Sequence, residues 1–378
     1  MSALLPYGRQ SISEGDIDAV AAVLRGDWLT TGPAVAEFEQ ALVNFTGAAT
    51  CVSVTSGTAA LHVAYAAAGI GPGDEVVTTP LTFAATASCA ILLGATVVFA
   101  DVEEDTGNLD APAAESAVTS RTKVVAAVDF AGHPAEMDAL RKVADGAGAL
   151  LIEDAAHSIG SLYHDRKVGT LADLTTFSFF PTKNMTTGEG GAVAAVDPVL
   201  GQRAARFHNH GLVRDRAEQR YPDEGPWHQE VHEVGLNYRL PDVLCVLGTS
   251  QLARIDAFKA RRREISRRYD EELADLDGVR VPARRPYVDP MWHLYPLRVL
   301  GGRRREVFDK LRAAGIGVQV NYIPVYWHPA FEDMGYRRGM CPRAEAYYLE
   351  EISLPMFVDL TEDDQSRVID AVRRALAG

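Results

Sequence analysis

The sequence predicts an α/β protein with a large, mainly parallel-sheet domain followed by a small C-terminal α+β domain. Between residues 50 and 196, short β-branched runs alternate with helix-like segments, which is typical of a parallel sheet covered on both faces. Beyond residue 254 the pattern changes to mixed helices and strands. A chain of 378 residues, 47% hydrophobic and 23% charged, is also long enough for two globular domains. We expect these domains at residues 1–255, including an N-terminal arm, and 256–378.

The elements of the large domain follow from hydrophobic periodicity. Ser13 with Asp16 predicts a helix start, and a second helix is expected at 35–45. Strands are expected at 51–55, 75–79, 96–100, 123–128, 149–154, 175–180 and 192–196. Helices at 59–68, 84–93, 112–118 and 137–146 separate the first five of these strands. Because no helix separates the last two strands, that edge of the sheet is expected to be mixed.

A long helical region is predicted at 243–276, across the expected boundary between the two domains. Strands are expected at 293–300 and 315–322, and helices at 304–314, 344–350 and 362–376.

Composition and charge exclude several classes of protein. A net charge of −14 argues against a nucleic-acid partner, which requires a basic surface. The N-terminus has no apolar signal core, and no run of residues is apolar enough to span a membrane. The four cysteines are scattered in apolar contexts, which is typical of reduced thiols, so we expect a cytoplasmic protein.

Lys183 directly follows an aromatic strand within the segment 175–191. Desolvation at such a strand end can lower the pKa of a lysine toward that of a nucleophilic amine. The alternative is a surface lysine in a hairpin, which is the commoner fate of lysine. The segment alone does not separate these two interpretations.

Other strand ends carry polar residues that suit a phosphate and a charged ring. Ser56, Gly57 and Thr58 open a helix, where N–H groups and hydroxyls can hold a phosphate, although a plain N-cap is the alternative. Asp154 closes a buried strand, so its carboxylate must be paired or hydrogen-bonded. His157 could lie beside it, but no second ligand pair with metal-site spacing is present, and no metal is expected.

Phe83 follows another strand and could stack on a flat ligand or pack in the core. Because the carboxyl ends of parallel strands meet at one edge, Lys183, Asp154, Phe83 and the phosphate site are expected to converge. This set fits pyridoxal 5′-phosphate (PLP), with a Schiff-base lysine and an aspartate that keeps the pyridine nitrogen protonated.

A set of motifs spread along the chain is specific to one family. The motifs are SGTAALH, GPGDEVVTTPLTFAATA, ADVEEDTGNLD, LLIEDAAHSIGS, FSFFPTKNMTTGEGG and LNYRL. Together they resemble the DegT/DnrJ/EryC1/StrS family of sugar-nucleotide aminotransferases. The resemblance implies a fold-type-I, aspartate aminotransferase-like PLP enzyme that works as a homodimer with active sites at the subunit interface.

The resemblance also implies roles for individual residues. Lys183 matches the Schiff-base lysine, and Asp154 matches the carboxylate that faces the pyridine nitrogen. The other matching positions are His157 near the ring hydroxyl, Phe83 stacked on the ring, Gly57, Thr58 and Ser178 beside Ser56 at the phosphate, and Asn237 reaching the phosphate from the neighbouring subunit.

In this family an amino donor, usually L-glutamate, supplies the amino group that passes through the cofactor to a ketosugar. The segment MTTGEGG resembles members that aminate sugar C4. Four further segments resemble the UDP-4-amino-4,6-dideoxy-N-acetyl-β-L-altrosamine transaminases of pseudaminic acid biosynthesis: PYGRQSISEGDI, WLTTGP, DEGPWHQE and VQVNYIPVYWHP. That likeness implies UDP-2-acetamido-2,6-dideoxy-β-L-arabino-hex-4-ulose as substrate. It also implies a sugar-nucleotide pocket lined by Tyr7, Trp28, Thr30, Tyr322 and His328.

Other functions stay open at this point. One alternative is another nucleotide ketosugar: a dTDP- or GDP-4-keto-6-deoxyhexose, a UDP-4-ketopentose or a 3-ketosugar. A non-catalytic PLP-binding regulator of the same fold is a second. A nicotinamide-dependent dehydrogenase is disfavoured, because GIGPGD at 69–74 precedes a strand rather than lying between a strand and a helix.

Overall fold

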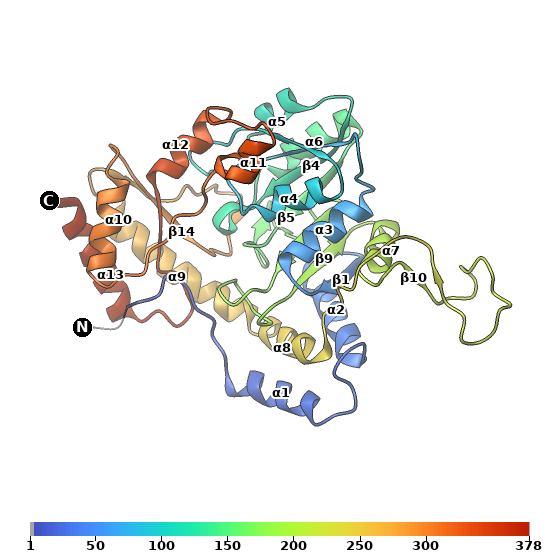
Figure 1. Cartoon of the computed structure of the whole chain (residues 1–378). Coiled ribbons are helices and arrows are strands. Elements are labelled where there is room, and N and C mark those ends of the chain that lie inside the picture. Colours follow the sequence, from blue (N-terminus) through green and yellow to red (C-terminus); the bar gives the residue numbers. More distant parts are fainter. Residues whose placement is uncertain (1–3, 378) are drawn as a thin grey trace.

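A seven-stranded sheet forms the centre of the larger part of the protein in the computed structural model, which describes residues 4–377 (Figure 1). Its strands, in spatial order, are β1 (Thr50–Val54), β9 (Gly191–Ala195), β8 (Leu174–Ser178), β5 (Leu150–Asp154), β4 (Thr122–Val128), β2 (Glu75–Thr78) and β3 (Thr96–Phe99). The strands β8, β5, β4, β2 and β3 pair in parallel, whereas β9 is antiparallel to both β1 and β8. The predicted fold class is confirmed, and the mixed region lies at the β1 edge.

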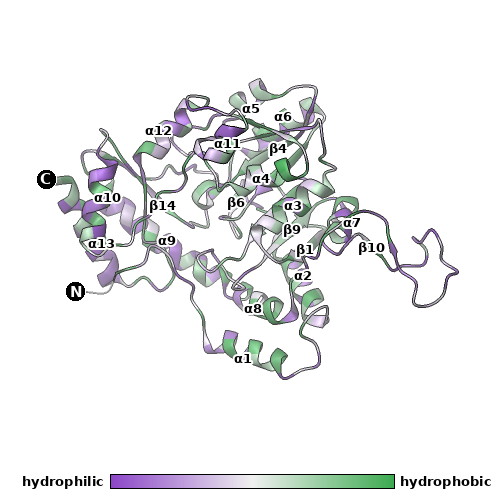
Figure 2. Ribbon diagram, viewed as in Figure 1, coloured by the Kyte–Doolittle hydropathy of each residue, from purple (hydrophilic) through white to green (hydrophobic). Residues whose placement is uncertain are grey.

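Helices cover both faces of this sheet. One face packs against α3 (Gly57–Ala67), α4 (Ala85–Leu92) and α7 (Pro198–Phe207). The other face packs against α2 (Pro33–Thr46), α5 (Ala111–Ala117), α6 (Met137–Ala147) and α8 (Asp242–Leu252). Figure 2 shows the strands and their facing helices as the most hydrophobic part of the chain. Because both faces of the sheet are buried, the sequence of each strand is a near-continuous run of apolar residues.

Strand alternation decides which face each polar strand-end residue joins. In β5, Ile152 packs on the α3 face and Leu151 packs on the α6 face. Because side chains alternate along a strand, Asp154 shares the face of Ile152, and Glu153 points to the opposite face. The carboxylate therefore emerges at the carboxyl end of the sheet beside α3 and α4.

A three-stranded antiparallel sheet organises the C-terminal part. It consists of β12 (Val279–Arg280), β14 (Tyr295–Val299) and β15 (Glu351–Leu354). The helices of this part are α9 (Ile255–Leu273), α10 (Arg304–Ala313), α11 (Pro329–Asp333), α12 (Pro342–Glu350) and α13 (Glu362–Ala377), with a 3-10 turn η2 (Val325–Trp327). Its apolar side chains join the core that covers the α3 face of the central sheet.

The predicted helical region at 243–276 is present as two helices, α8 and α9, because the backbone at Arg254 is not helical. One expectation for this part of the chain was wrong. The segment 315–322 is not a strand: it makes isolated bridges, Ile316 to Leu5 and Gln319 to Ser353, one position at a time. The segment lies between the N-terminal residues and β15, and neither pairs with it over a continuous stretch.

The N-terminal region packs along the larger part of the chain. Helix α1 (Glu14–Leu24) begins at Ser13, where the predicted capping box with Asp16 is present. A buried carboxylate, Asp242, accepts hydrogen bonds from the N–H groups of Gly32 (2.8 Å) and Ala34 (3.1 Å) and so caps α2.

The remaining elements are short. They are β6 (Leu162–Tyr163), β7 (Arg166–Lys167) and β13 (Val288–Asp289) in one small sheet, the 3-10 turn η1 (Phe130–Gly132), and the pair β10 (Leu212–Val213) and β11 (Glu230–Val231). The segment around β10 and β11 extends away from the body (Figure 1). Among residues 4–377, no helix has the length and apolar character needed to cross a bilayer.

Candidate active site

A cavity of about 780 Å³ lies at the carboxyl ends of the parallel strands. This volume is within the range of ordinary small-molecule sites. Most of the residues singled out from the sequence line it: Tyr7, Ser56, Gly57, Thr58, Phe83, Asp154, His157, Ser178, Lys183, Tyr322 and His328. The expected convergence of distant strand ends at one edge of the sheet is therefore present.

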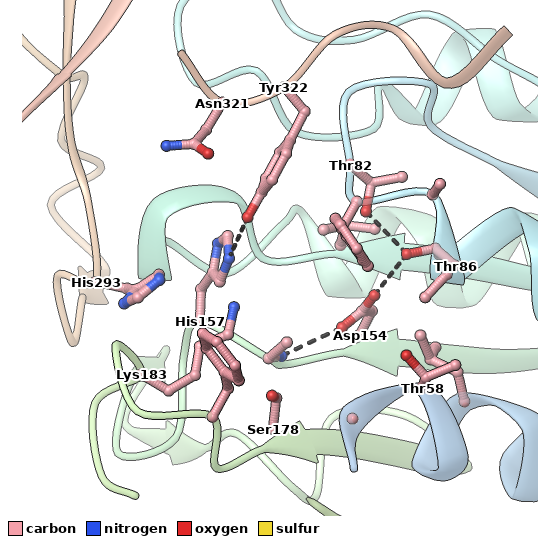
Figure 3. Close-up of a pocket in the computed structure, with 18 of the residues that line it drawn as sticks. Thr58, Thr82, Thr86, Asp154, His157, Ser178, Lys183, His293, Asn321 and Tyr322 are labelled. Atoms are coloured by element: carbon pink, nitrogen blue, oxygen red, sulfur yellow. Dashed lines mark hydrogen bonds between the residues drawn. The ribbon is translucent and has the colours of Figure 1, made fainter. Parts of the chain in front are cut away.

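Lys183 lies on the turn that follows β8, with its N–H donating to the carbonyl of Phe180 at 2.9 Å. Its side chain lines the cavity and is directed toward His157 (Figure 3). Burial of the amine lowers the pKa of Lys183 to about 8, although the nearby Asp154 carboxylate opposes that shift. The geometry is that of a desolvated, reactive amine rather than of a hairpin lysine in solvent.

Asp154 is buried and held by two threonines that form a directed chain (Figure 3). The hydroxyl of Thr86 donates to Oδ2 of Asp154 at 2.7 Å, and the hydroxyls of Thr82 and Thr86 are 2.8 Å apart. A hydroxyl has a single proton, so Thr82 must donate to Thr86. Burial raises the pKa of Asp154, and the hydrogen bond from Thr86 works against that rise.

The first turn of α3 faces the same cavity. The hydroxyl of Ser56 accepts from the N–H of Ala59 at 3.0 Å, so Ser56 is the N-cap of this helix. A Cβ added at Gly57 would lie 2.7 Å from Cβ of Ser178, so only glycine allows α3 to approach β8 this closely. N–H groups of a first helical turn, together with the hydroxyls of Thr58 and Ser178, make a cradle for a phosphate.

His157 and Tyr322 form the opposite wall of the cavity. Nε2 of His157 lies 3.0 Å from the hydroxyl of Tyr322, and Nδ1 of His157 is buried without a hydrogen-bond partner among the described residues. Burial lowers the pKa of His157 far below its usual range, so this imidazole is neutral. An unpaired nitrogen in a buried site is a position where a ligand atom would relieve a desolvation cost.

Phe83 is 63% exposed and makes an edge contact with Tyr322, the ring centroids being 6.3 Å apart. A core aromatic would be covered on both faces. The exposed ring at the cavity suits a stacking contact with a flat ligand.

Three predicted residues lie outside the cavity of their own chain. Trp28 and Thr30 are exposed on the loop between α1 and α2, where Asp242 fixes the backbone at Gly32. They do not line the described pocket of their own chain, and their contact with the sugar nucleotide stays a prediction. Asn237 is also exposed, and it bridges to Asn209 at the base of the projecting β10–β11 segment.

Sequence reasoning missed Thr82, Thr86 and His293, all of which line the cavity. The threonines stand in the quoted segment PLTFAATA, four residues apart, which is the spacing that brings two side chains onto one side of a helical turn. His293 stands alone before β14, and no local pattern marks it.

These residues fit PLP, judged by their chemistry. The cavity holds an amine with a lowered pKa and a buried carboxylate that accepts a hydrogen bond from a hydroxyl. It also holds an anion cradle in which only glycine fits at position 57, and a buried imidazole nitrogen without a hydrogen-bond partner among the described residues. When bound, PLP acts as an electron sink for the carbon attached to the transferred nitrogen. The fold and site thus define a PLP-dependent enzyme of the α/β type.

Comparison with known proteins identifies the family. Residues 10–373 match the DegT/DnrJ/EryC1/StrS aminotransferase family, and the chain belongs to it. Spore coat polysaccharide biosynthesis protein SpsC of Bacillus subtilis is 40% identical, with 99% of this chain and 97% of SpsC covered. A UDP-4-amino-4,6-dideoxy-N-acetyl-β-L-altrosamine transaminase of Campylobacter jejuni is 37% identical, with 98% and 96% covered.

Solved structures agree with this family. Spr1654 of Streptococcus pneumoniae, assigned as a sugar aminotransferase and solved in PMP and PLP forms, superposes in its PMP form with a TM-score of 0.93 at 30% identity. Helicobacter pylori PseC, an aminotransferase of pseudaminic acid biosynthesis, superposes with a TM-score of 0.92 at 29% identity. Each comparison covers 99% of both chains. The protein is a PLP-dependent sugar aminotransferase, and its family acts on nucleotide sugars with an amino donor.

Proposed function

We propose that this enzyme transfers the amino group of L-glutamate to C4 of a UDP-linked 4-keto-6-deoxy sugar, UDP-2-acetamido-2,6-dideoxy-β-L-arabino-hex-4-ulose. The observation that carries the chemistry is the convergence of Lys183, Asp154 and the first turn of α3 on one cavity. The choice of sugar is supported by the full-length likeness to the Campylobacter transaminase and to PseC.

In this proposal each side chain has a separate role. Lys183 would hold the cofactor and, once freed, would accept and return the proton at the donor carbon, a role that a lysine with a pKa of about 8 can fill near neutral pH. Asp154 keeps a proton on the pyridine nitrogen, and His157 donates to or accepts from the ring hydroxyl. Phe83 stacks on the ring.

The phosphate and the sugar nucleotide take the remaining positions. Gly57, Thr58 and Ser178 hold the cofactor phosphate beside the Ser56 cap. Tyr7, Tyr322 and His328 are proposed to contact the sugar nucleotide, because they line the same cavity.

We also propose a homodimer in which Asn237 of each chain contacts the cofactor phosphate in the active site of the other chain. Asn237 is exposed and lies outside the cavity of its own chain, next to a projecting segment that carries exposed apolar side chains, Trp227 (80%) and Val234 (91%). Such exposure is typical of surfaces that contact another chain.

Mixed dimers test this arrangement. Asn237→Asp and Lys183→Ala chains, each inactive alone, should regain activity when combined, since one site of the mixed dimer has both native residues. No recovery in verified mixed dimers would contradict the shared site.

The substrate is tested with L-glutamate labelled with nitrogen-15 and a panel of UDP-, dTDP- and GDP-linked 4-ketosugars and 3-ketosugars. We expect labelled nitrogen at C4 of the UDP-linked sugar, read by mass spectrometry and NMR. Transfer only to C3, or only to a dTDP- or GDP-linked sugar, would overturn the substrate assignment and leave the transaminase class intact.

A further inference from the structure

His293 is a buried histidine at the cavity with no assigned role. It is 5% exposed and lines the cavity, and its ring lies against that of His157, with centroids 4.4 Å apart. No described residue makes a hydrogen bond to either of its ring nitrogens (Figure 3). Nδ1 has almost no solvent-accessible surface. A buried polar group without a partner is costly unless a ligand satisfies it.

The backbone around His293 is fixed by hydrogen bonds, and its ring is confined by burial and by packing against His157. Its N–H donates to the carbonyl of Ala131 at 2.8 Å, and its carbonyl accepts from the buried guanidinium of Arg262 at 3.3 Å. A ring placed this way, lining a cavity with Nε2 unpaired, has the geometry of a preorganised binding group.

The side chains that line the cavity include few positive charges that could bind a carboxylate substrate. Among the described residues that line it, Lys183 is the only lysine or arginine, while Asp154 and Glu189 are acidic. The Lys183 amine is needed for the reaction itself. Among the groups that this chain itself supplies, the donors left for the carboxylate of an amino acid are therefore histidines and uncharged polar side chains.

The position of His293 suits that carboxylate. In the proposed reaction, the donor nitrogen replaces the Lys183 amine, and the α-carboxylate is attached to the carbon that carries this nitrogen. His293 is near enough to Lys183 for that ammonium to act on it electrostatically. His157 is already committed to Tyr322 through Nε2 and, in the proposed function, to the cofactor hydroxyl through Nδ1.

We propose that His293 binds the α-carboxylate of the amino donor in the first half-reaction, and that uncharged sugar hydroxyls occupy the same space in the second half-reaction. An arginine in this place would remain a buried, unpaired cation whenever the sugar was bound. An imidazole avoids that cost because it can be neutral with the sugar and take one proton from solvent with the carboxylate. This inference rests on the proposed function.

The groups around His293 favour a neutral ring before the donor arrives. Burial lowers the pKa of His293 far below its usual range, and the cations of Lys183 and Arg262 act in the same direction, while the neutral ring of His157 adds no charge. Binding of a carboxylate opposes all of these effects, so the complex should take up about one proton.

Two substitutions separate the possible roles. His293→Leu removes both nitrogens, whereas His293→Asn keeps an N–H donor that cannot be protonated. We expect His293→Leu to raise the L-glutamate concentration for half-maximal conversion by about tenfold to a hundredfold, the effect of losing a hydrogen bond to a charged group. We expect a smaller rise for His293→Asn and less than a threefold change in the half-saturating ketosugar concentration for both.

Calorimetry with glutarate, a dicarboxylate without an amine, gives a readout besides activity. In two buffers of different ionisation enthalpy, the wild-type holoenzyme should take up about one proton on binding glutarate, and His293→Asn should take up almost none. His164→Asn, at an exposed histidine outside the cavity, is the matched control and should behave as wild type. Borohydride trapping of cofactor on Lys183 establishes that each variant is folded and loaded.

The proposal is overturned if His293→Leu binds glutarate and L-glutamate as tightly as wild type. It is also overturned if wild type binds glutarate without proton uptake, or does not bind it. Failure of the proposed function is a different result: a wild-type holoenzyme that binds glutarate through His293 but releases no 2-oxoglutarate from L-glutamate.

Discussion

The hydroxyl of Thr86 donates a 2.7 Å hydrogen bond to Oδ2 of Asp154, and both side chains are buried. This bond favours the ionised carboxylate, which is the form that can hold a proton on a pyridine nitrogen. This hydrogen bond joins helix α4 to the end of strand β5. The packing of α4 on the sheet therefore helps to keep Asp154 ionised at the bottom of the cavity.

Replacement of Thr86 by valine should weaken cofactor binding while keeping the fold. Valine has the same shape but no hydroxyl, so the carboxylate loses its only side-chain donor among the described residues. We expect the Kd for PLP to rise at least tenfold, corresponding to about 1.5–3 kcal/mol for a hydrogen bond to a charged group. Thr78→Val is the control, since its buried hydroxyl donates to a backbone carbonyl, that of Ala126, instead. Equal affinities in Thr86→Val and wild type would refute this role.

Reactivity of Lys183 should follow an unusually low pKa. With a pKa of about 8, roughly a tenth of this amine is neutral at pH 7, far more than for an ordinary lysine. Acylation of the apoenzyme, followed by peptide mass spectrometry, should give a half-maximal rate at Lys183 near pH 8. Exposed Lys142 on α6 serves as the internal reference. A Lys183 profile that coincides with that of the reference would contradict the desolvated amine.

Gly57→Ala should damage the phosphate cradle. The added Cβ would lie 2.7 Å from Cβ and 2.9 Å from Oγ of Ser178, so α3 or β8 must shift. We expect about a tenfold or greater loss of affinity for PLP and a smaller loss for pyridoxal, which has no phosphate. Gly146→Ala in α6, where the added Cβ meets nothing within 4 Å, should keep PLP affinity and stabilise its helix by up to about 1 kcal/mol. If Gly57→Ala weakens both ligands equally, the cradle is not the phosphate site.

Glu351 should make part of the stability depend on pH. Burial raises the pKa of Glu351 to about 8, although hydrogen bonds from Ser353 and the Asn321 N–H oppose the shift. Because the folded state holds this proton more tightly than the unfolded state, stability from this group is full below pH 4.5 and declines as pH rises to 8.

The substitution Glu351→Gln isolates this contribution, because glutamine is close in shape and does not ionise in this range. The difference in unfolding free energy between wild type and Glu351→Gln, measured by urea denaturation, should move in favour of Glu351→Gln between pH 5 and pH 8. A difference that is constant with pH would show that Glu351 does not titrate in the folded state.

The parts of the site that sequence could predict are those tied to a strand end. Lys183 and Asp154 follow apolar strand runs, and a parallel sheet brings such ends together, so their convergence follows from topology. His293 could not be found this way. It stands far along the chain, and its position at the cavity depends on how its backbone packs against Ala131 and Arg262.

The error in the fold prediction has a related origin. Alternating apolar residues at 315–322 match a strand, but pairing needs a continuous neighbour, and periodicity does not report one. The path of the loop that carries Trp28 and Thr30 is also not predictable from local pattern, because the Asp242 cap on α2 sets it through a contact between residues about two hundred positions apart.

The central claim is that Lys183 carries the cofactor and releases it to the amino donor. Borohydride reduction of the holoenzyme, followed by peptide mass spectrometry, tests this most directly. The account predicts cofactor mass on the peptide containing Lys183, and loss of that mass when L-glutamate is added before reduction. Cofactor fixed to another lysine, or a Lys183 adduct that L-glutamate leaves unchanged, would contradict it.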